Sequence, residues 1–275
     1  MPEASTSERP PPPRAGSLAG RVALVTGGTR GIGAAIGHSL AGDGAAIAAG
    51  YSRDHAAAEA FTAALSGGGG ATSVHQGNIG SADDCRRVVA EVIDEHGRLD
   101  ILVNNAGMLI DRSVIAMTDE DWYRVLAVNL SGAFFMSQAA LPHMVERGSG
   151  RIINISSLAA QRGNIGQANY SASKSGLFGL TRSFAREAAG LLHKAGHLGD
   201  PDGLGLTVNT VAPGLIETEM IQDVPERVMD KLRAEIPLRR LGRPDEVARI
   251  VHFLCADASS YVTGQIWSVN GGMEM

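Results

Sequence analysis

Residues 21–33, Arg21-Val-Ala-Leu-Val-Thr-Gly-Gly-Thr-Arg-Gly-Ile-Gly33, join a short apolar run to a glycine-rich turn. Such a run is typical of a strand buried on both faces, and the glycines permit a tight turn into a helix. A pyrophosphate can approach this backbone closely, and the helix N-terminus offers it unpaired N–H groups and a favourable dipole. The G-x-x-x-G-x-G spacing alone also fits a turn that only packs a helix on a strand. The strand before it and the helix after it favour nucleotide binding.

The rest of the chain alternates short apolar runs with helical segments. We expect strands at 21–26, 45–49, 74–76, 99–103, 151–155, 207–211 and 265–269, and helices at 32–42, 82–96, 119–147 and 170–193. This alternation predicts an α/β fold, a Rossmann-type doubly wound sheet of seven parallel strands with helices on both faces. A single domain should span residues 18–275. Ligands of such sheets bind beyond the carboxyl ends of the strands, where the motifs described below fall.

The composition fits one globular domain and narrows the range of partners. The chain has 275 residues, of which 44% are hydrophobic, and a formal net charge of −5. The negative charge argues against nucleic acid, and no apolar stretch approaches the roughly 18 residues of a membrane span. Residues 1–17 are proline-rich and without an apolar run, so we expect a disordered tail and no signal peptide. Cys85 and Cys255 are expected to be buried, reduced thiols of a cytoplasmic protein.

The end of the second expected strand bears on the choice of nicotinamide cofactor. An acidic residue about 20 residues beyond the glycines would favour NAD, but the chain reads Gly50-Tyr-Ser-Arg53 there. Arg30 in the turn and Arg53 suit the 2′-phosphate of NADP(H), since guanidinium groups pair well with phosphate. The alternative for Arg53 is a solvated charge at a helix start, and Asp54 follows it directly. We expect NADP(H) to be favoured over NAD(H).

Three residues predict acid–base chemistry on a carbonyl or an alcohol. Tyr170 and Lys174 are spaced i and i+4, so they share one face of a helix, and Ser157 follows the fifth expected strand. A nearby ammonium favours the phenolate, so we expect Lys174 to lower the pKa of Tyr170 from its ordinary value near 10. Tyr170 would exchange a proton with the substrate oxygen, and Ser157 would donate a hydrogen bond to it.

Two competing interpretations lack the partners that they require. Ser171-Ala-Ser-Lys174 matches the S-x-x-K of serine acyltransferases, but neither an S-D-N nor a K-T-G string occurs in the chain. His193 and His197 lie at helical spacing without further ligands, so no metal site is expected.

Taken together, these residues resemble the short-chain dehydrogenase/reductase family from Leu18 to Met275. The motifs that carry the resemblance are Thr26-Gly-Gly-Thr-Arg-Gly-Ile-Gly33, Asn104-Asn-Ala-Gly107, Asn129, Ser157, Tyr170-Ser-Ala-Ser-Lys174 and Pro213-Gly214. The resemblance implies an oxidoreductase in which Asn129, Ser157, Tyr170 and Lys174 are catalytic. It also implies that Asn129 holds a water that links Lys174 to solvent, and that Lys174 binds the nicotinamide ribose.

The cofactor residues implied by the motifs extend along the whole expected crevice. Asn78 and Ile79 would contact the adenine, Asn105 to Gly107 would line the cleft, and Ile216 with Thr218 would hold the carboxamide. The complete expected set is Gly27, Thr29, Arg30, Gly31, Ile32, Gly33, Ser52, Arg53, Asn78, Ile79, Asn105, Ala106, Gly107, Tyr170, Lys174, Pro213, Gly214, Ile216 and Thr218.

Within the family, three segments are most similar to 3-oxoacyl-acyl-carrier-protein reductases and acetoacetyl-CoA reductases. They are Gly166-Gln-Ala-Asn-Tyr170, Ile236-Pro-Leu-Arg-Arg-Leu-Gly242 and Val269-Asn-Gly-Gly-Met-Glu-Met275. This resemblance implies NADPH-dependent reduction of a 3-oxoacyl thioester, carried by acyl carrier protein or CoA. The alternatives are an NAD(P)-dependent dehydrogenase of another secondary alcohol, sugar or steroid, and a non-catalytic NADP-binding sensor.

Two segments depart from the pattern of these reductases. An inserted loop is expected at about 191–203, where it would either be a plain surface loop or change a partner surface near the helix end. The stretch Met108-Leu-Ile-Asp111 replaces a typical Thr-Arg before the aspartate. The basic residues left to receive a carrier's phosphopantetheine are Arg112, Arg147, Arg162 and Lys194.

The resemblance also implies a lid and an assembly. Residues 215–240 are expected to close over the substrate, with Met220, Ile221 and Val224 on their apolar face. The long helices at 119–147 and 170–193, with the C-terminal strand, are expected to form a homotetramer. Small residues would allow two copies of the second helix to approach closely, namely Ser173, Gly176, Gly179 and Ser183.

Overall fold

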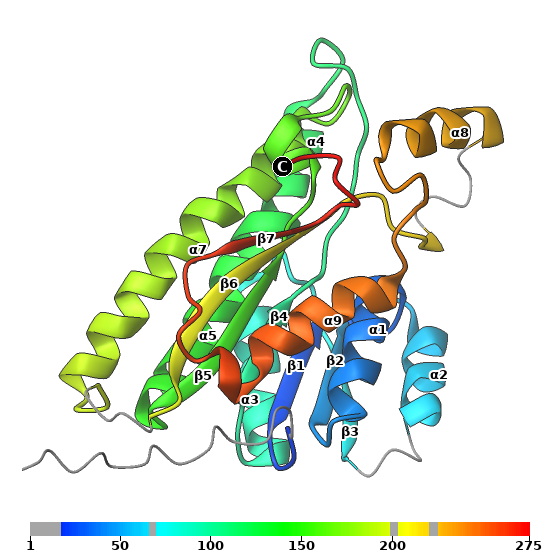
Figure 1. The fold of residues 1–275 in the computed structure, drawn as a ribbon. Helices are drawn as coiled ribbons and strands as arrows, with labels where there is room; N and C mark the ends of the chain where they lie inside the picture. Colours follow the sequence, from blue (N-terminus) through cyan, green and yellow to red (C-terminus); the bar gives the residue numbers. More distant parts are fainter. Residues whose placement is uncertain (1–17, 66–69, 199–202, 220–224) are drawn as a thin grey trace, which may run out of the picture.

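The computed structural model describes residues 18–65, 70–198, 203–219 and 225–275. The expected tail at 1–17 and the expected lid residues Met220, Ile221 and Val224 lie outside these ranges. One sheet of seven parallel strands, in the order β3-β2-β1-β4-β5-β6-β7, forms the centre of the molecule (Figure 1). The strands are β1 Val22–Thr26, β2 Ala46–Tyr51, β3 Thr72–Gln76, β4 Ile101–Asn104, β5 Ser149–Ile155, β6 Gly205–Pro213 and β7 Ile266–Val269. The predicted fold class is therefore confirmed.

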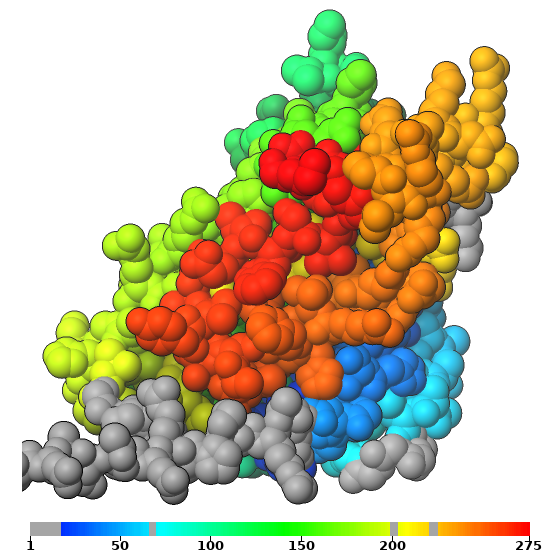
Figure 2. Space-filling view, in the orientation of Figure 1, coloured from blue at the N-terminus to red at the C-terminus, as the bar shows by residue number. Residues whose placement is uncertain are grey.

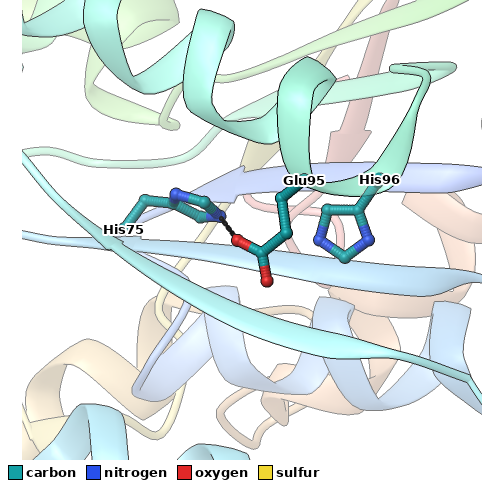
Figure 3. Close-up of side chains that lie close together, drawn as sticks. All are labelled: His75, Glu95 and His96. Carbon is teal, nitrogen blue, oxygen red and sulfur yellow. Dashed lines mark ion pairs between the residues drawn. The ribbon is translucent and has the colours of Figure 1, made fainter.

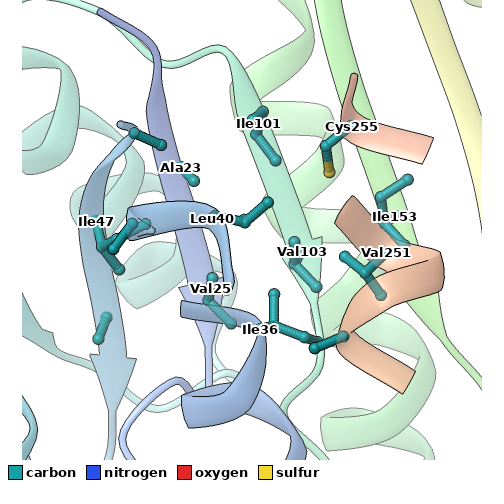
Figure 4. Packing of buried hydrophobic residues seen from close by; sticks show 14 of the residues in the cluster. Ala23, Val25, Ile36, Leu40, Ile47, Ile101, Val103, Ile153, Val251 and Cys255 are labelled. Atoms are coloured by element: carbon teal, nitrogen blue, oxygen red, sulfur yellow. The ribbon is translucent and has the colours of Figure 1, made fainter. Parts of the chain in front are cut away.

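Helices α1 (Gly31–Ala41), α2 (His55–Leu65) and α9 (Pro244–Cys255) cover one face of the sheet. Their apolar side chains meet those of the central strands in a continuous core, which includes Ile36 and Leu40 of α1 and Val251 of α9 (Figure 4). Every residue of β1 is buried, because it lies between two helical layers.

Helices α3 (Ala82–His96), α5 (Gly132–Glu146) and α7 (Ala168–Lys194) cover the opposite face around a second core cluster. The two thiols divide between the faces, with Cys255 in the first cluster and Cys85 in the second. Both cysteines are free and buried, as predicted. Burial raises the pKa of Cys85 to about 11 and that of Cys255 to about 12, so neither thiol is reactive at neutral pH.

The helix predicted over 119–147 is confirmed as a continuous helical stretch, Asp119–Glu146, but it is not regular throughout. The structure has α4 (Asp119–Leu126), then a π-helical turn, η1 (Ala127–Ser131), and then α5. Thr118 begins α4 with a capping box, which the sequence pattern Thr-x-x-Asp already indicates. A π-turn inserts one extra residue into the helical repeat, and such turns occur mostly at functional sites. Here the extra residue turns the side chain of Asn129 into the protein.

The stretch Asp119–Glu146 has the length and apolar composition of a membrane span. Its inner face carries Met136, Ala140 and Met144, which are buried in the second core cluster. We therefore interpret it as a core helix that packs on the sheet rather than as a membrane span.

The C-terminal part of the chain adds a layer beside the carboxyl edge of the sheet. Helix α8 (Glu226–Glu235) stands away from the body, in orange in the space-filling view (Figure 2). Beneath it, Met229, Ile236 and Leu241 form a small apolar cluster of their own. Two short elements complete the described fold, α6 (Ala159–Arg162) and the 3-10 turn η3 (Asp257–Ser259).

Candidate active site

The crevice for a ligand is set by the strand order. Strand β1 lies between β2 and β4 in the sheet. The chain continues from β1 to β2 and β3 on one side, and then returns to β4 on the other side of β1. The direction in which strands are added therefore reverses at the boundary between β1 and β4. Parallel sheets bind ligands at this switch point, outside the carboxyl ends of the strands. Thr26, Asn104, Ile155 and Pro213 end β1, β4, β5 and β6 at this same edge, and the predicted site residues follow them.

The glycine turn after β1 is folded tightly against the segment after β4. Gly27 has φ +59° and Gly31 has φ +53°, a region that favours glycine. A Cβ on Gly33 would lie 2.1 Å from the carbonyl oxygen of Gly27, so no larger residue fits there. The Nδ2 of Asn105 donates to the carbonyl oxygens of Thr26, at 2.9 Å, and Gly27, at 3.0 Å. Asn105 therefore holds the turn in shape.

The start of α1 faces the crevice without a side-chain cap. Its N-cap is Arg30, which makes no capping hydrogen bond, and no acidic residue lies in the first turn. The unpaired N–H groups and the dipole of such an end favour an anion. Thr218 lies across the turn, because a Cβ on Gly31 would be 3.7 Å from its Cγ2.

The two predicted arginines differ in their surroundings. Arg30 Nη1 lies 3.2 Å from Glu219 Oε2, and both side chains are exposed. Arg53 is exposed at the end of β2, and within the described part of the chain no ion pair engages it. Ser52 beside it is also exposed, and its carbonyl oxygen accepts from Gln76 Nε2.

Asn78 and Ile79 form the turn after β3. The Oδ1 of Asn78 accepts from the N–H of Gly80, and the N–H of Asn78 donates to Asp84. Ile79 packs against the start of α5, where a Cβ on Gly132 would lie 2.1 Å from its Cγ2. The structure thus places this turn at the same edge of the sheet, beyond β2.

Tyr170 and Lys174 share the face of α7 that is turned towards β5. The Nζ of Lys174 donates to the carbonyl oxygen of Ile155 at 2.7 Å and lies 5.9 Å from the centre of the Tyr170 ring. Lys174 is only 4% exposed, and Tyr170 is half-buried. The two side chains and the end of β5 therefore form one group.

The expected effect of Lys174 on the pKa of Tyr170 is wrong for the protein without ligand. Burial raises the pKa of Tyr170, a hydrogen bond with Ser157 lowers it in part, and the charge of Asp111 raises it further. Burial also lowers the pKa of Lys174 to about 8, so its ammonium loses its proton at a lower pH than that of an exposed lysine. Desolvation disfavours both the phenolate and the ammonium, and it is the largest cause of both shifts.

Ser157 is oriented with its hydroxyl towards Tyr170. Its Oγ accepts from the N–H of Ala159 at 3.1 Å. The next residue, Leu158, donates its N–H to the carbonyl oxygen of Pro213, which ties the loop to the end of β6. The O–H of Ser157 can then donate towards Tyr170 or a substrate oxygen.

Asn129 joins three segments from inside the π-helical turn. Its Oδ1 accepts from the N–H of Met108 at 2.8 Å, and its Nδ2 donates to the carbonyl oxygen of Met108 and to Ser173 Oγ. Gly107 lies between the two polar groups, since its Cβ would be 3.4 Å from Lys174 Nζ and 3.5 Å from Asn129 Oδ1. The structure therefore brings Asn129 and Lys174 to the same pocket wall.

The residues after β6 complete the crevice wall. Pro213 is buried, and a Cβ on Gly214 would lie 2.8 Å from the Cα of Asn270. Ile216 is buried as well and forms an isolated parallel bridge with Gly242. This wall therefore depends on a close backbone contact that only glycine permits at position 214.

The sequence analysis missed Asn169, which positions the catalytic helix. This residue is fully buried, and its Oδ1 accepts from the N–H of Tyr170 at 2.7 Å. Its Nδ2 donates to the carbonyl oxygens of Ile110, at 3.2 Å, and Asp121, at 3.3 Å. Nothing in its sequence surroundings distinguishes it from a solvated asparagine, because its partners are remote backbone groups.

A buried chain of polar side chains, also missed, holds α7 on the sheet. Asn104 Nδ2 donates to Asn154 Oδ1, and Asn154 Nδ2 donates to Thr181 Oγ1, both at 2.8 Å. Thr181 shares a 2.6 Å hydrogen bond with Thr210. This chain links β4, β5, β6 and α7, and buried networks of this kind specify one arrangement of the elements.

Residues 191–198 of the inserted segment lie far from Tyr170. Helix α7 continues through Lys194, so it includes the first four residues of the loop expected at 191–203. At 1.5 Å per residue, Lys194 lies about 36 Å along the helix from Tyr170. Figure 1 shows this end of α7 at the opposite edge of the sheet from the crevice. Arg147, which ends α5, lies at that edge too, so only Arg112 and Arg162 remain near the site.

A family model described as "Enoyl-(Acyl carrier protein) reductase" matches residues 27–274. The chain belongs to the short-chain dehydrogenase/reductase family. Members of this family are oxidoreductases, and reductases of this kind use a nicotinamide cofactor.

Several curated members of the family align over nearly the whole chain. A 3-oxoacyl-[acyl-carrier-protein] reductase of Thermotoga maritima is 39% identical over 93% of this chain and 98% of its own length. The enzyme of the same name from Synechocystis is 40% identical over 94% of this chain and 99% of its own length. An acetoacetyl-CoA reductase of Shinella zoogloeoides is 42% identical over 92% of this chain and 98% of its own length.

Proposed function

We propose that this short-chain dehydrogenase/reductase reduces a 3-oxoacyl thioester to the 3-hydroxyacyl thioester with NADPH in the cytoplasm. The observation that carries the proposal is the convergence of Ser157, Tyr170 and Lys174 at the carboxyl edge of β5. The names of the similar enzymes from Thermotoga and Shinella supply the substrate class.

The turn after β1 fits a dinucleotide by its backbone conformation and its unpaired N–H groups. The turn with Gly27 and Gly31 leads into an uncapped helix start, which suits a pyrophosphate. Gly107 leaves open the space beside Lys174 Nζ, where a side chain would crowd a ribose. When bound there, NADPH supplies the hydride that reduces the carbonyl carbon.

The protein's own groups handle the proton and the developing charge. The raised pKa keeps Tyr170 protonated at neutral pH, which is the form that can donate a proton to the substrate oxygen. Ser157 would stabilise the same oxygen by donating its O–H to it, since its Oγ accepts from the N–H of Ala159. Lys174 would hold the ribose, and Asn129 would support the path by which Tyr170 recovers its proton.

The reaction is tested with the purified full-length chain, acetoacetyl-CoA and either NADPH or NADH. We expect turnover that prefers NADPH. Turnover with crotonyl-CoA instead would assign the chain to enoyl reduction, the activity in the description of the family model. NADPH binding without turnover across a panel of ketones would support the non-catalytic sensor.

We expect Arg53→Ala to raise the KM for NADPH by about 10–100-fold, because it removes a charge-assisted hydrogen bond to the 2′-phosphate. The KM for NADH should not change, since NADH lacks that phosphate.

Glu219→Gln should have the opposite effect and lower the KM for NADPH by about 2–5-fold, because it releases Arg30 from a surface ion pair. Steady-state kinetics with both cofactors measure these effects. An equal change for NADPH and NADH would contradict the assignment of the two arginines.

Two arginines near the crevice, Arg112 and Arg162, are the candidates to bind the phosphate of the acyl carrier. Arg112 Nε lies 3.6 Å from Asp121, and Arg162 Nη2 lies 3.2 Å from Glu235 on α8. Both are paired within the chain, so a phosphopantetheine phosphate would have to compete with these carboxylates. Acyl carrier protein and CoA both present that phosphate, and the names of the relatives include both carriers.

Residues 215–240 would form the lid over the bound thioester.

We also propose a homotetramer in which one interface joins copies of η1, α5 and α7. A groove of about 540 Å³ lies on this face, lined by Leu130, Ser131, Phe134, Phe135, Gly176, Leu180 and Ser183. Ser173 takes no part in this face, because it is fully buried in the protein.

Gly179 offers a clean test of that interface, because a Cβ there meets no atom within 4 Å. Gly179→Arg should therefore leave the fold intact and shift the mass in sedimentation velocity from tetramer to dimer or monomer. Gly190→Arg, at an equally open position near the far end of α7, is the matched control. A tetramer that persists in the Gly179 variant would contradict this interface.

A further inference from the structure

A cluster of histidines and acidic groups lies outside the active-site crevice, between the edge strand β3 and helix α3. Ser73 and His75 lie two residues apart on β3, so they project from the same face of the strand. Glu95 and His96 come from the last turn of α3. Figure 3 shows the carboxylate of Glu95 between the two imidazole rings.

One nitrogen of each ring and a carboxylate oxygen of Glu95 lie within 4.8 Å of one another. Glu95 Oε2 is 3.7 Å from His75 Nε2. Ser73 Oγ lies 2.8 Å from His75 Nε2 and 2.7 Å from His96 Nε2. Two imidazoles, a carboxylate and a hydroxyl thus converge, and His75 is only 6% exposed.

The outer nitrogen of His75 is held by a carboxylate. Its Nδ1 lies 3.4 Å from Glu91 Oε2, and the other oxygen of Glu91 accepts from Arg87 Nη1 at 2.6 Å. When Nδ1–H donates to Glu91, the lone pair of Nε2 points inward to the cluster. Histidine ligands of metal ions are commonly oriented in this way by a carboxylate on the opposite ring nitrogen.

Hydrogen bonds alone leave acceptor groups of this cluster facing one another. Ser73 Oγ can donate its one hydrogen to the Nε2 of one histidine and accept from the Nε2–H of the other. With the inward lone pair on His75, its Nε2 also faces the carboxylate of Glu95.

We propose that His75, Glu95 and His96 form a binding site for a divalent transition metal of the Zn²⁺ type. Two imidazole nitrogens and one carboxylate are an ordinary zinc ligand set, with one position left for Ser73 Oγ or a water. The ion would join the edge strand β3 to the end of α3. This role is structural and does not depend on the proposed reaction.

The test is a titration of the untagged, chelator-treated full-length chain with Co²⁺, followed by competition with Zn²⁺. Tetrahedral Co²⁺ absorbs visible light, so the spectrum reports the geometry of the site. We expect one Co²⁺ per chain, displacement by Zn²⁺, and a higher melting temperature with either metal.

Three variants locate the ion. His96→Ala should abolish the tetrahedral spectrum, and Glu95→Gln should weaken binding strongly, although Glu95 is an exposed residue whose loss should not affect folding. Glu91→Gln should weaken binding by about 10–100-fold through the orientation of His75. Circular dichroism of the metal-free variants establishes that each is folded.

The matched control is the double substitution of His193 and His197 by alanine. These two exposed histidines also lie close in sequence, but no third ligand joins them among the groups that the structure describes. Binding should be unchanged in this control. The proposal is overturned if the parent chain shows no saturable tetrahedral Co²⁺ binding, or if binding survives in the His96 and Glu95 variants.

Discussion

Tyr170→Phe is expected to lower kcat for carbonyl reduction by a factor of about 10²–10⁴, the usual contribution of a positioned general acid. The substitution removes only the phenolic O–H, so the ring keeps its packing and its place on α7. Binding of NADPH should persist, because the glycine turn and the start of α1 are unaffected. Loss of turnover with intact cofactor binding is therefore the expected pattern.

Pre-steady-state hydride transfer and fluorescence titration with NADPH measure the two quantities separately. Tyr261→Phe is the matched control, because Tyr261 is fully exposed on the surface and its O–H should have no effect. A variant at position 170 that retains more than about a tenth of wild-type kcat would contradict the role of the phenol, since general acids contribute at least 10²-fold.

Lys174→Met is expected to stabilise the protein by about 1–3 kcal/mol at pH 7 while it removes most of the activity. Burial lowers the pKa of Lys174 from 10.5 to about 8, a difference of about 2.5 units, and each unit corresponds to 1.36 kcal/mol. The upper limit is thus about 3 kcal/mol, and loss of the hydrogen bond to Ile155 reduces the gain. A charged group that is buried for its function commonly lowers the free energy of unfolding of the protein.

The pH dependence of unfolding provides a second readout for Lys174. Below pH 8 the lysine is protonated in both states, so the folded state bears the full desolvation penalty. Between pH 8 and 10.5 the unfolded chain binds more protons, and the contribution of Lys174 to stability rises with pH. The two buried thiols act in the opposite direction above pH 9, because their pKa values are raised on folding.

The difference between the parent chain and Lys174→Met cancels the contribution of the thiols. Chemical denaturation from pH 7 to 10 should show the stability gain of the variant shrinking as pH rises above 8. Lys231→Met, at an exposed position of α8, is the matched control and should show no such trend. A variant less stable than the parent chain at pH 7 would show that Lys174 is not buried at a net penalty.

Much of the fold was predictable because its determinants are local. The apolar runs, the turn with Gly27 and Gly33, and the alternation of strands and helices specify a parallel sheet directly. The segment Arg243-Pro-Asp-Glu246 also begins α9 with a proline in its first turn, and the Glu246 carboxylate accepts from the N–H of Arg243, but the sequence analysis did not use this pattern. Helix α2 was likewise not predicted, since its alanine-rich stretch has a weak apolar pattern.

The sequence by itself determined which groups could do chemistry. Tyr170 and Lys174 are one helical turn apart, and Ser157 follows a strand, so their meeting at one edge of the sheet follows from the order of the elements. Only the tertiary structure decided the π-helical turn at Asn129, the buried anchor Asn169 and the direction in which the pKa of Tyr170 moves. It also placed residues 191–198 at the far edge of the sheet and brought His75 to His96. These features depend on burial and on contacts between residues remote in the chain, because desolvation and hydrogen-bond pairing arise only when the chain has folded.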